Sequence, residues 1–160
     1  MIDKFLKGLR NYLNAFTNEP PVSHLVGEWS SGNDPSSNEP LIRFIYDRKA
    51  FSRDQVKHSA FMPLKNKSTG RFETSVFRVF GLASGEIVEL SRSARQDKQP
   101  KAAAHNKYQH IPEIGLQLDP NNEPERHADI IGWPHEKFEQ IDLAQKLAAF
   151  SDLERYEDNN

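Results

Sequence analysis

The chain has 160 residues, of which 36% are hydrophobic, 10% aromatic and 28% charged. This composition is typical of one folded domain with room for a short additional segment. The absence of cysteine excludes disulfides, thiolate metal sites and cysteine nucleophiles. Apolar runs extend over only a few residues, which excludes a membrane span, and the N-terminus lacks the apolar stretch of a secretory signal. We therefore expect a cytoplasmic protein.

The net charge of −2 conceals a segregation of charge along the chain. Residues 1–40 contain 3 Lys or Arg and 5 Asp or Glu, residues 41–107 contain 14 and 6, and residues 108–160 contain 4 and 12. A basic middle segment can attract phosphates, because clustered cations concentrate anions near the surface. Alternatively, the basic middle segment and the acidic C-terminal segment lie side by side and neutralise each other, each exposed pair contributing ~0–1 kcal/mol.

Residues 2–16 have the pattern of an amphipathic helix, with apolar side chains three or four positions apart. Its apolar face can dock on the domain's own core, on a second copy of the chain or on another partner. Residues 17–40 contain four of the ten prolines and a polar run, which indicates a linker or long loop. We place the boundary between this N-terminal appendage and the folded domain near residue 40.

From residue 41 onward, short segments rich in β-branched and aromatic residues predict an α+β domain over residues 41–153. We expect a small mixed or antiparallel sheet of about five strands. They are placed at residues 41–46, 56–62, 73–80, 114–118 and 127–131.

Three further segments have helical patterns. Residues 84–91 predict a short helix with Ser84 as its N-cap, and three successive alanines at 102–104 indicate a helix running toward Pro112. Residues 135–153 predict a C-terminal helix that packs on the sheet, with Phe138 on its buried face. Residues 154–160 are expected to fray.

His127 and Asp129 are the best candidates for chemistry. If residues 127–131 form a strand, the two side chains project from the same face, since side chains alternate along a strand. A histidine beside an aspartate is suited to general acid–base chemistry. The alternative is structural, with each side chain paired to a neighbour. No phosphate-binding glycine loop, zinc-helix motif or nucleophile elbow occurs in the sequence, and we expect no cofactor and no metal.

Two arginines, Arg43 and Arg78, lie within otherwise apolar strands. A buried charge needs a partner, and one bound anion shared by both would supply it. The basic segment around Lys57 also intersperses cations with aromatic residues, as surfaces that bind single-stranded nucleic acid do. The predicted ligand-binding residues are Arg43, Arg78, Arg126, Trp133 and Lys57, with His127 lining the same pocket.

Five short motifs resemble those of a group of small uncharacterised bacterial proteins. They are residues 43–46 (RFIY), 60–63 (AFMP), 73–78 (ETSVFR), 115–116 (GL) and 126–134 (RHADIIGWP). The resemblance covers about residues 41–150. It implies a bacterial or phage cytoplasmic origin and makes residues 1–40 an addition to the shared domain. No activity is associated with the group, so the resemblance assigns no catalytic residue.

Three hypotheses follow from the sequence. The first is binding of a phosphate-bearing ligand, a nucleotide or nucleic acid, by the basic middle segment. The second is a protein-interaction module or homodimer that uses residues 2–16 and the acidic C-terminal helix. The third is a small enzyme that uses His127 and Asp129.

Overall fold

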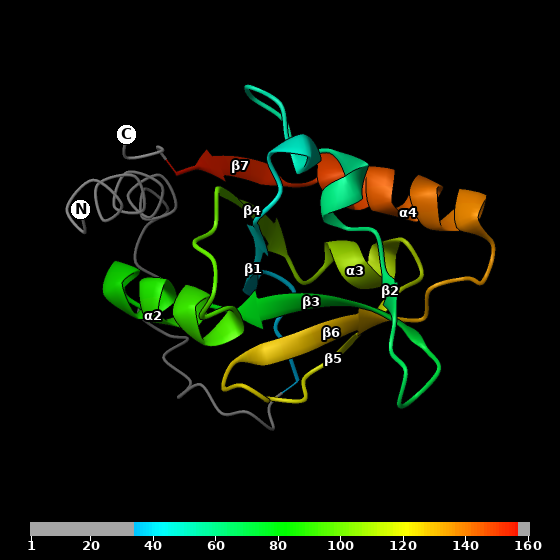
Figure 1. Cartoon of the computed structure of the whole chain (residues 1–160). Helices are drawn as coiled ribbons and strands as arrows, with labels where there is room; N and C mark the ends of the chain where they lie inside the picture. The colour runs from blue at the N-terminus through cyan, green and yellow to red at the C-terminus, as the bar shows by residue number, and fades with distance from the viewer. Residues whose placement is uncertain (1–33, 157–160) are drawn as a thin grey trace.

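The computed structural model describes residues 34–156, which form an α+β fold around one antiparallel sheet (Figure 1). The strands are β1 (Pro40–Ile45), β2 (Leu64–Lys65), β3 (Phe72–Arg78), β4 (Ala102–Lys107), β5 (Gln117–Asp119), β6 (His127–Ile131) and β7 (Asp152–Arg155). The helices are the 3₁₀ turns η1 (Arg48–Ala50) and η2 (His58–Ala60), and α2 (Ser84–Ala94), α3 (His110–Glu113) and α4 (Lys137–Ala149). The predicted helix over residues 2–16 lies outside the described residues.

The sheet has seven strands rather than the expected five, in the order β5-β6-β3-β1-β4-β7, with β2 paired to β3. All pairs are antiparallel. None of the helices within residues 34–156 has the length and apolarity that crossing a bilayer requires.

Both faces of the sheet are covered, because apolar side chains point to both sides of the central strands. On one face Leu41 and Ile130 belong to a core that includes Ile111 of α3 and Leu147 of α4. On the other face a smaller core packs against Ile87 of α2. Figure 1 accordingly shows α2 and α4 on different sides of the sheet. The smaller core does not extend over the whole of its face, and the polar side chains described below occupy the part at β6 and β5.

The strands predicted at residues 41–46, 73–80 and 127–131 are confirmed as β1, β3 and β6. The helix predicted at residues 84–91 is α2, although Ala83 rather than Ser84 occupies its N-cap position. The Glu86 carboxylate there accepts a hydrogen bond from the Ala83 N–H at 2.7 Å. It satisfies one of the N–H groups at the helix start.

Two other predictions are wrong. The alanines expected to begin a helix form β4, where Ala102, Ala103 and Ala104 are each 0% exposed. Alanine favours helices, but its small side chain also lets the two cores pack closely against both faces of a central strand. Here this packing outweighs the helix propensity. Residues 56–62 form η2 and its flanking turn rather than a strand, with Phe61 N–H donating to the carbonyl of His58 at 2.9 Å.

The C-terminal region also differs from the expectation. α4 ends at Ala149 and the chain turns back to form β7 against β4, so Glu154 and Arg155 belong to the sheet rather than to a frayed tail. Phe138 is 70% exposed rather than buried. The buried stripe of α4 runs through Gln140, Ala144, Leu147 and Ala148, and Phe138 lies off this stripe.

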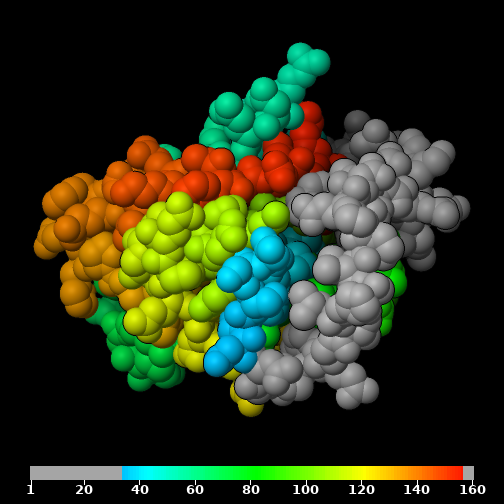
Figure 2. All heavy atoms as spheres, turned by 180° about the vertical axis from the view of Figure 1, so that it is seen from behind, coloured from blue at the N-terminus to red at the C-terminus, as the bar shows by residue number. Residues whose placement is uncertain are grey.

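The folded domain begins before residue 40. Glu39 is 5% exposed, and its carboxylate binds the Arg78 guanidinium at 2.5 and 3.0 Å. The carbonyl of Ser37 accepts a hydrogen bond from the N–H of Gln109. Figure 2 shows residues 34–40, in blue, lying against the yellow-green segment that carries α3. A boundary at residue 40 would therefore cut a buried ion pair.

Candidate functional site

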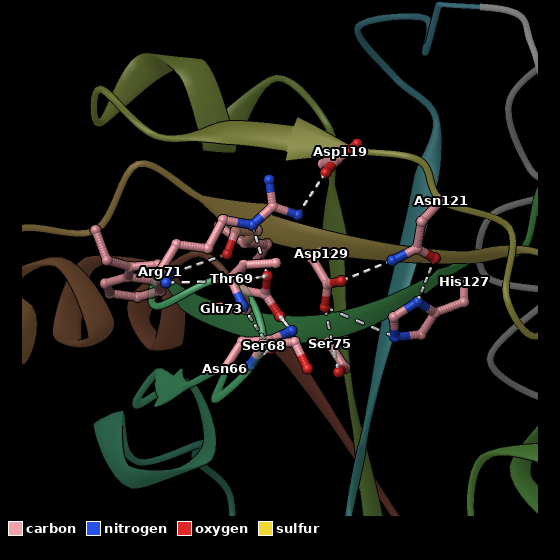
Figure 3. Close-up of polar contacts among 12 residues, drawn as sticks. Asn66, Ser68, Thr69, Arg71, Glu73, Ser75, Asp119, Asn121, His127 and Asp129 are labelled. Atoms are coloured by element: carbon pink, nitrogen blue, oxygen red, sulfur yellow. Dashed lines mark hydrogen bonds and ion pairs between the residues drawn. The ribbon is translucent and has the colours of Figure 1, made fainter.

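A polar row lies on the same sheet face as α2, across β3 and β6 (Figure 3). The antiparallel register places Ser75 opposite Asp129 and Phe77 opposite His127. Directly opposite residues project to the same face, so the four side chains lie side by side. The predicted proximity of His127 and Asp129 is present, with Nε2 and Oδ1 at 3.8 Å. The Ser75 hydroxyl donates to the same Asp129 Oδ1 at 3.4 Å, and the His127 ring packs edge-on against Phe77.

Asn121, in the turn after β5, holds both His127 and Asp129. Its Nδ2 donates to Asp129 Oδ2 at 2.7 Å, and its Oδ1 lies 2.7 Å from His127 Nδ1. The same Oδ1 accepts the backbone N–H of Glu123 at 3.2 Å, which identifies it as the oxygen, since a backbone N–H only donates. Nδ1 of His127 must therefore carry a proton, and in the neutral ring Nε2 is the acceptor.

The environment brings the pKa values of His127 and Asp129 closer together. Burial lowers the pKa of His127, with a further decrease from Arg43, while Asp129 opposes the change. Burial raises the pKa of Asp129, and His127 opposes that rise. The side chains are 12% and 9% exposed, so each retains limited contact with solvent. A neutral imidazole next to a carboxylate is an arrangement able to accept a hydrogen bond or a proton.

A second polar cluster adjoins this row at the β2–β3 hairpin. Arg71 binds Glu73 through Nε at 2.5 Å and Asp119 of β5 through Nη2 at 2.6 Å. Asn66 donates to the other oxygen of Glu73 at 2.8 Å. The Arg71 guanidinium thus compensates the negative charge of two carboxylates next to Ser75.

Arg43 lies where β1 and β3 separate. The two strands are paired only at Leu41–Arg78 and Ile42–Phe77, and beyond these positions the Arg43 side chain bridges the gap. Its Nε donates to the carbonyl of Ala60 at 3.0 Å, and its Nη1 donates to the carbonyl of Ser75 at 2.8 Å. Among the described residues no carboxylate hydrogen-bonds to Arg43. Burial lowers the pKa of its guanidinium, which nevertheless stays charged.

A hollow of about 160 Å³ opens beside Arg43. It is lined by Arg43, Met62, Leu64, Lys65, Asn66, Glu73 and Ser75. Ser75 thus belongs both to the hollow and to the row that contains Asp129 and His127. His127, Asp129 and Asn121 do not line the hollow.

The other residues predicted to bind a ligand lie elsewhere. Arg78 is 2% exposed and pairs with Glu39, a carboxylate from the segment before β1. Trp133 is 7% exposed, and its Nε1 donates to the carbonyl of Ile130 at 2.9 Å. Arg126 donates to the carbonyl of Phe80 at 2.6 Å, and Lys57 is exposed at the start of η2. None of the four lines the hollow.

The fold shows how the basic middle segment and the acidic C-terminal segment lie relative to each other. Strands from the basic middle segment and strands from the acidic C-terminal segment are interleaved, with β3 beside β6 and β4 beside β7. Arg71 pairs with Asp119 across these segments, and buried His105 lies 2.8 Å from Glu154. Arg71 is thus a cation of the basic segment that is compensated by a carboxylate of the acidic segment.

Within residues 34–156 no three His, Asp or Glu side chains converge as a metal site would require. Comparison of the chain with family models, with curated proteins and with solved structures finds no match.

The sequence did not reveal Asn121 and Ser75 as site residues. Asn121 had only the signal of a turn residue, and its carboxylate partner is eight positions away in the chain. Ser75 is one of several serines, and its partner Asp129 is 54 positions away. The strand alternation of residues 73–80 would have placed Ser75 on one face, but only the register with β6 shows which residue it meets.

Proposed function

We propose that this protein binds a small phosphate-bearing ligand in the hollow beside Arg43. The observation that carries the proposal is the guanidinium of Arg43, which is mostly enclosed and has neutral carbonyl groups as its hydrogen-bond partners. Asp129 is a carboxylate that acts on Arg43 electrostatically, but it does not hydrogen-bond to the guanidinium. A buried charge is unfavourable unless it is paired, and a bound anion in contact with the guanidinium would complete that pairing. Arginine is also well suited to phosphate, because its planar N–H groups match phosphate oxygens.

Two features of the hollow favour a phosphate over a larger anionic surface. The volume of about 160 Å³ accommodates a phosphate group with a few attached atoms. Lys65 lies at the same hollow and adds a second cation. Glu73 also lines it, but Arg71 and Asn66 both bind the Glu73 carboxylate, which reduces its repulsion of an anion.

The test is isothermal titration calorimetry of the full chain with inorganic phosphate and with adenosine monophosphate at low salt. Arg43→Gln removes the charge and keeps a hydrogen-bond donor. Lys57→Gln is the matched control, because it removes one charge from an exposed position that does not line the hollow. Loss of a charge-assisted hydrogen bond is expected to weaken binding about 10- to 100-fold in Arg43→Gln. Lys57→Gln should bind within about 2-fold of the wild type, since an exposed charge contributes little.

Absence of phosphate binding by the wild-type chain, or equal weakening by both substitutions, would contradict the proposal. Thermal unfolding of each variant establishes that it is folded. A parallel salt titration with a short single-stranded oligonucleotide separates a small ligand from nucleic acid. Binding that falls steeply with salt and depends on Lys57 as much as on Arg43 would indicate a nucleic-acid surface instead.

A further inference from the structure

Leu64, on β2, is the most exposed large hydrophobic side chain among the described residues, with an exposed fraction of 76%. Pairing of β2 with β3 places it directly opposite Glu73, so it stands on a strand rather than in an irregular loop. One exposed leucine is common on a protein surface. This one lines the hollow beside Arg43, where Met62 is a second apolar side chain. Two apolar side chains thus share a hollow with the charge on which the proposed function depends.

The hollow has two kinds of lining. Arg43 and Lys65 provide cations, whereas Met62 and Leu64 provide apolar surface. Side chains from both faces of the sheet can line the hollow, because β1 and β3 pair at only two positions and separate beyond them. An inorganic phosphate would bind the cations and leave the exposed Leu64 in contact with water. Covering this side chain with an apolar group is favourable in proportion to the area removed from water.

The size and chemistry of the apolar lining favour an aromatic ring. A cavity of about 150 Å³ holds a benzene ring in a protein core. The hollow has a volume of about 160 Å³, and Leu64 is exposed to solvent, so a ring joined to a bound phosphate can extend outward over this side chain. Thioether sulfur makes favourable contacts with aromatic rings. Met62 therefore favours an aromatic group over an alkyl group of similar size.

We infer that Met62 and Leu64 form an apolar wall that selects the organic group of the ligand, and that the ligand is an aryl phosphate monoester. This inference rests on the proposed function, since it places the phosphate of the same ligand at Arg43. The phosphate contacts Arg43 and Lys65, and the ring contacts Met62 and Leu64. Met62 and Leu64 are specificity-determining residues in this arrangement.

Isothermal titration calorimetry of the full chain at pH 8 compares phenyl phosphate with inorganic phosphate, both of which are mainly dianions at this pH. The wild type should bind phenyl phosphate about 10-fold more tightly, because contact between the ring and Leu64 removes apolar surface from water. In Leu64→Ser this preference should fall to about 2-fold, while the affinity for inorganic phosphate stays within about 2-fold of the wild type. Phe138→Ser is the matched control and should retain the full preference, because Phe138 is 70% exposed and does not line the hollow.

A second comparison tests the aromatic ring. Met62→Leu keeps the approximate volume and the apolarity of the side chain and removes its sulfur. The ratio of the affinities for phenyl phosphate and cyclohexyl phosphate should fall about 3-fold in this variant, since the sulfur interacts favourably with the aromatic ring alone. Thermal unfolding of each variant establishes that it is folded.

A third titration distinguishes two sources of the same chemical group. A short peptide with a central phosphotyrosine carries an aryl phosphate on a polypeptide. Binding of this peptide with the same dependence on Leu64 supports a ligand that is part of a protein. Binding of phenyl phosphate without binding of the peptide supports a free aryl phosphate.

The outcomes separate the two proposals. If the wild type binds inorganic phosphate as tightly as phenyl phosphate, the apolar wall is overturned and phosphate binding is left intact. Absence of binding by all the phosphate compounds overturns both. Equal loss of the preference in Leu64→Ser and Phe138→Ser overturns the assignment of Leu64. An unchanged ratio of phenyl to cyclohexyl phosphate affinities in Met62→Leu overturns the aromatic ring as the group that Met62 selects.

Discussion

The ion pair between Glu39 and Arg78 provides the most direct test of how this fold is stabilised. The two side chains are 6% and 2% exposed, and their closest atoms are 2.5 Å apart. Glu39 comes from the segment before β1, whereas Arg78 ends β3. Glu39→Gln keeps the shape of the side chain and removes the carboxylate charge that faces Arg78. Removing one partner of a buried pair typically destabilises a protein by about 3–5 kcal/mol.

We therefore expect Glu39→Gln to lower the free energy of unfolding by about 3 kcal/mol, which is a large fraction of a small domain's stability. Urea unfolding followed by tryptophan fluorescence measures this. Glu89→Gln is the control, since Glu89 and Arg92 also pair at 2.5 Å but are 67% and 57% exposed. The control should change stability by at most about 1 kcal/mol.

The double substitution Glu39→Leu with Arg78→Met should recover most of the stability, because well-packed apolar residues often replace a buried pair without loss. If Glu39→Gln and Glu89→Gln shift the unfolding midpoint by the same small amount, the pair does not stabilise the domain. The assignment of residue 39 to the folded domain would then fail with it.

Three further changes test the backbone and the packing. Gly70, in the β2–β3 hairpin, has a φ of +74°, and an added Cβ would meet no atom within 4 Å, so Gly70→Ala should destabilise by about 1 kcal/mol through backbone strain alone. Gly85 lies in α2 without a positive φ, and an added Cβ there would also meet no atom within 4 Å. Gly85→Ala should therefore stabilise the domain by about 1 kcal/mol in the same urea assay. Equal changes in stability at both glycines would refute the argument. Ala103→Leu on β4 should destabilise by about 1–3 kcal/mol and lower the thermal midpoint, because the site is 0% exposed and lies opposite Phe44; an unchanged midpoint would mean that the sheet layers can separate there.

The sequence predicted the arrangement of site residues only where the alternation of side chains along a single strand was enough to place them. His127 and Asp129 were predicted to share a face of one strand, and they do, because that prediction depends only on the two-residue period of an extended chain. Arg43 and Arg78 looked equivalent in the sequence. Their partners distinguish them, since Arg78 meets a carboxylate from the segment before β1 and Arg43 meets two carbonyls at the point where two strands diverge.

By itself, then, the sequence determined the strands β1, β3 and β6 and the presence of the helices α2 and α4. Its apolar pattern did not place every side chain correctly, since Phe138 of α4 is 70% exposed. Only the tertiary structure decided that three alanines form the strand β4, since burial on both faces outweighs their preference for helix. It also decided that Asn121 and Ser75 complete the site with residues distant in the chain. Strand register fixes such pairings, and register depends on how separate segments pack together rather than on the pattern within any one of them.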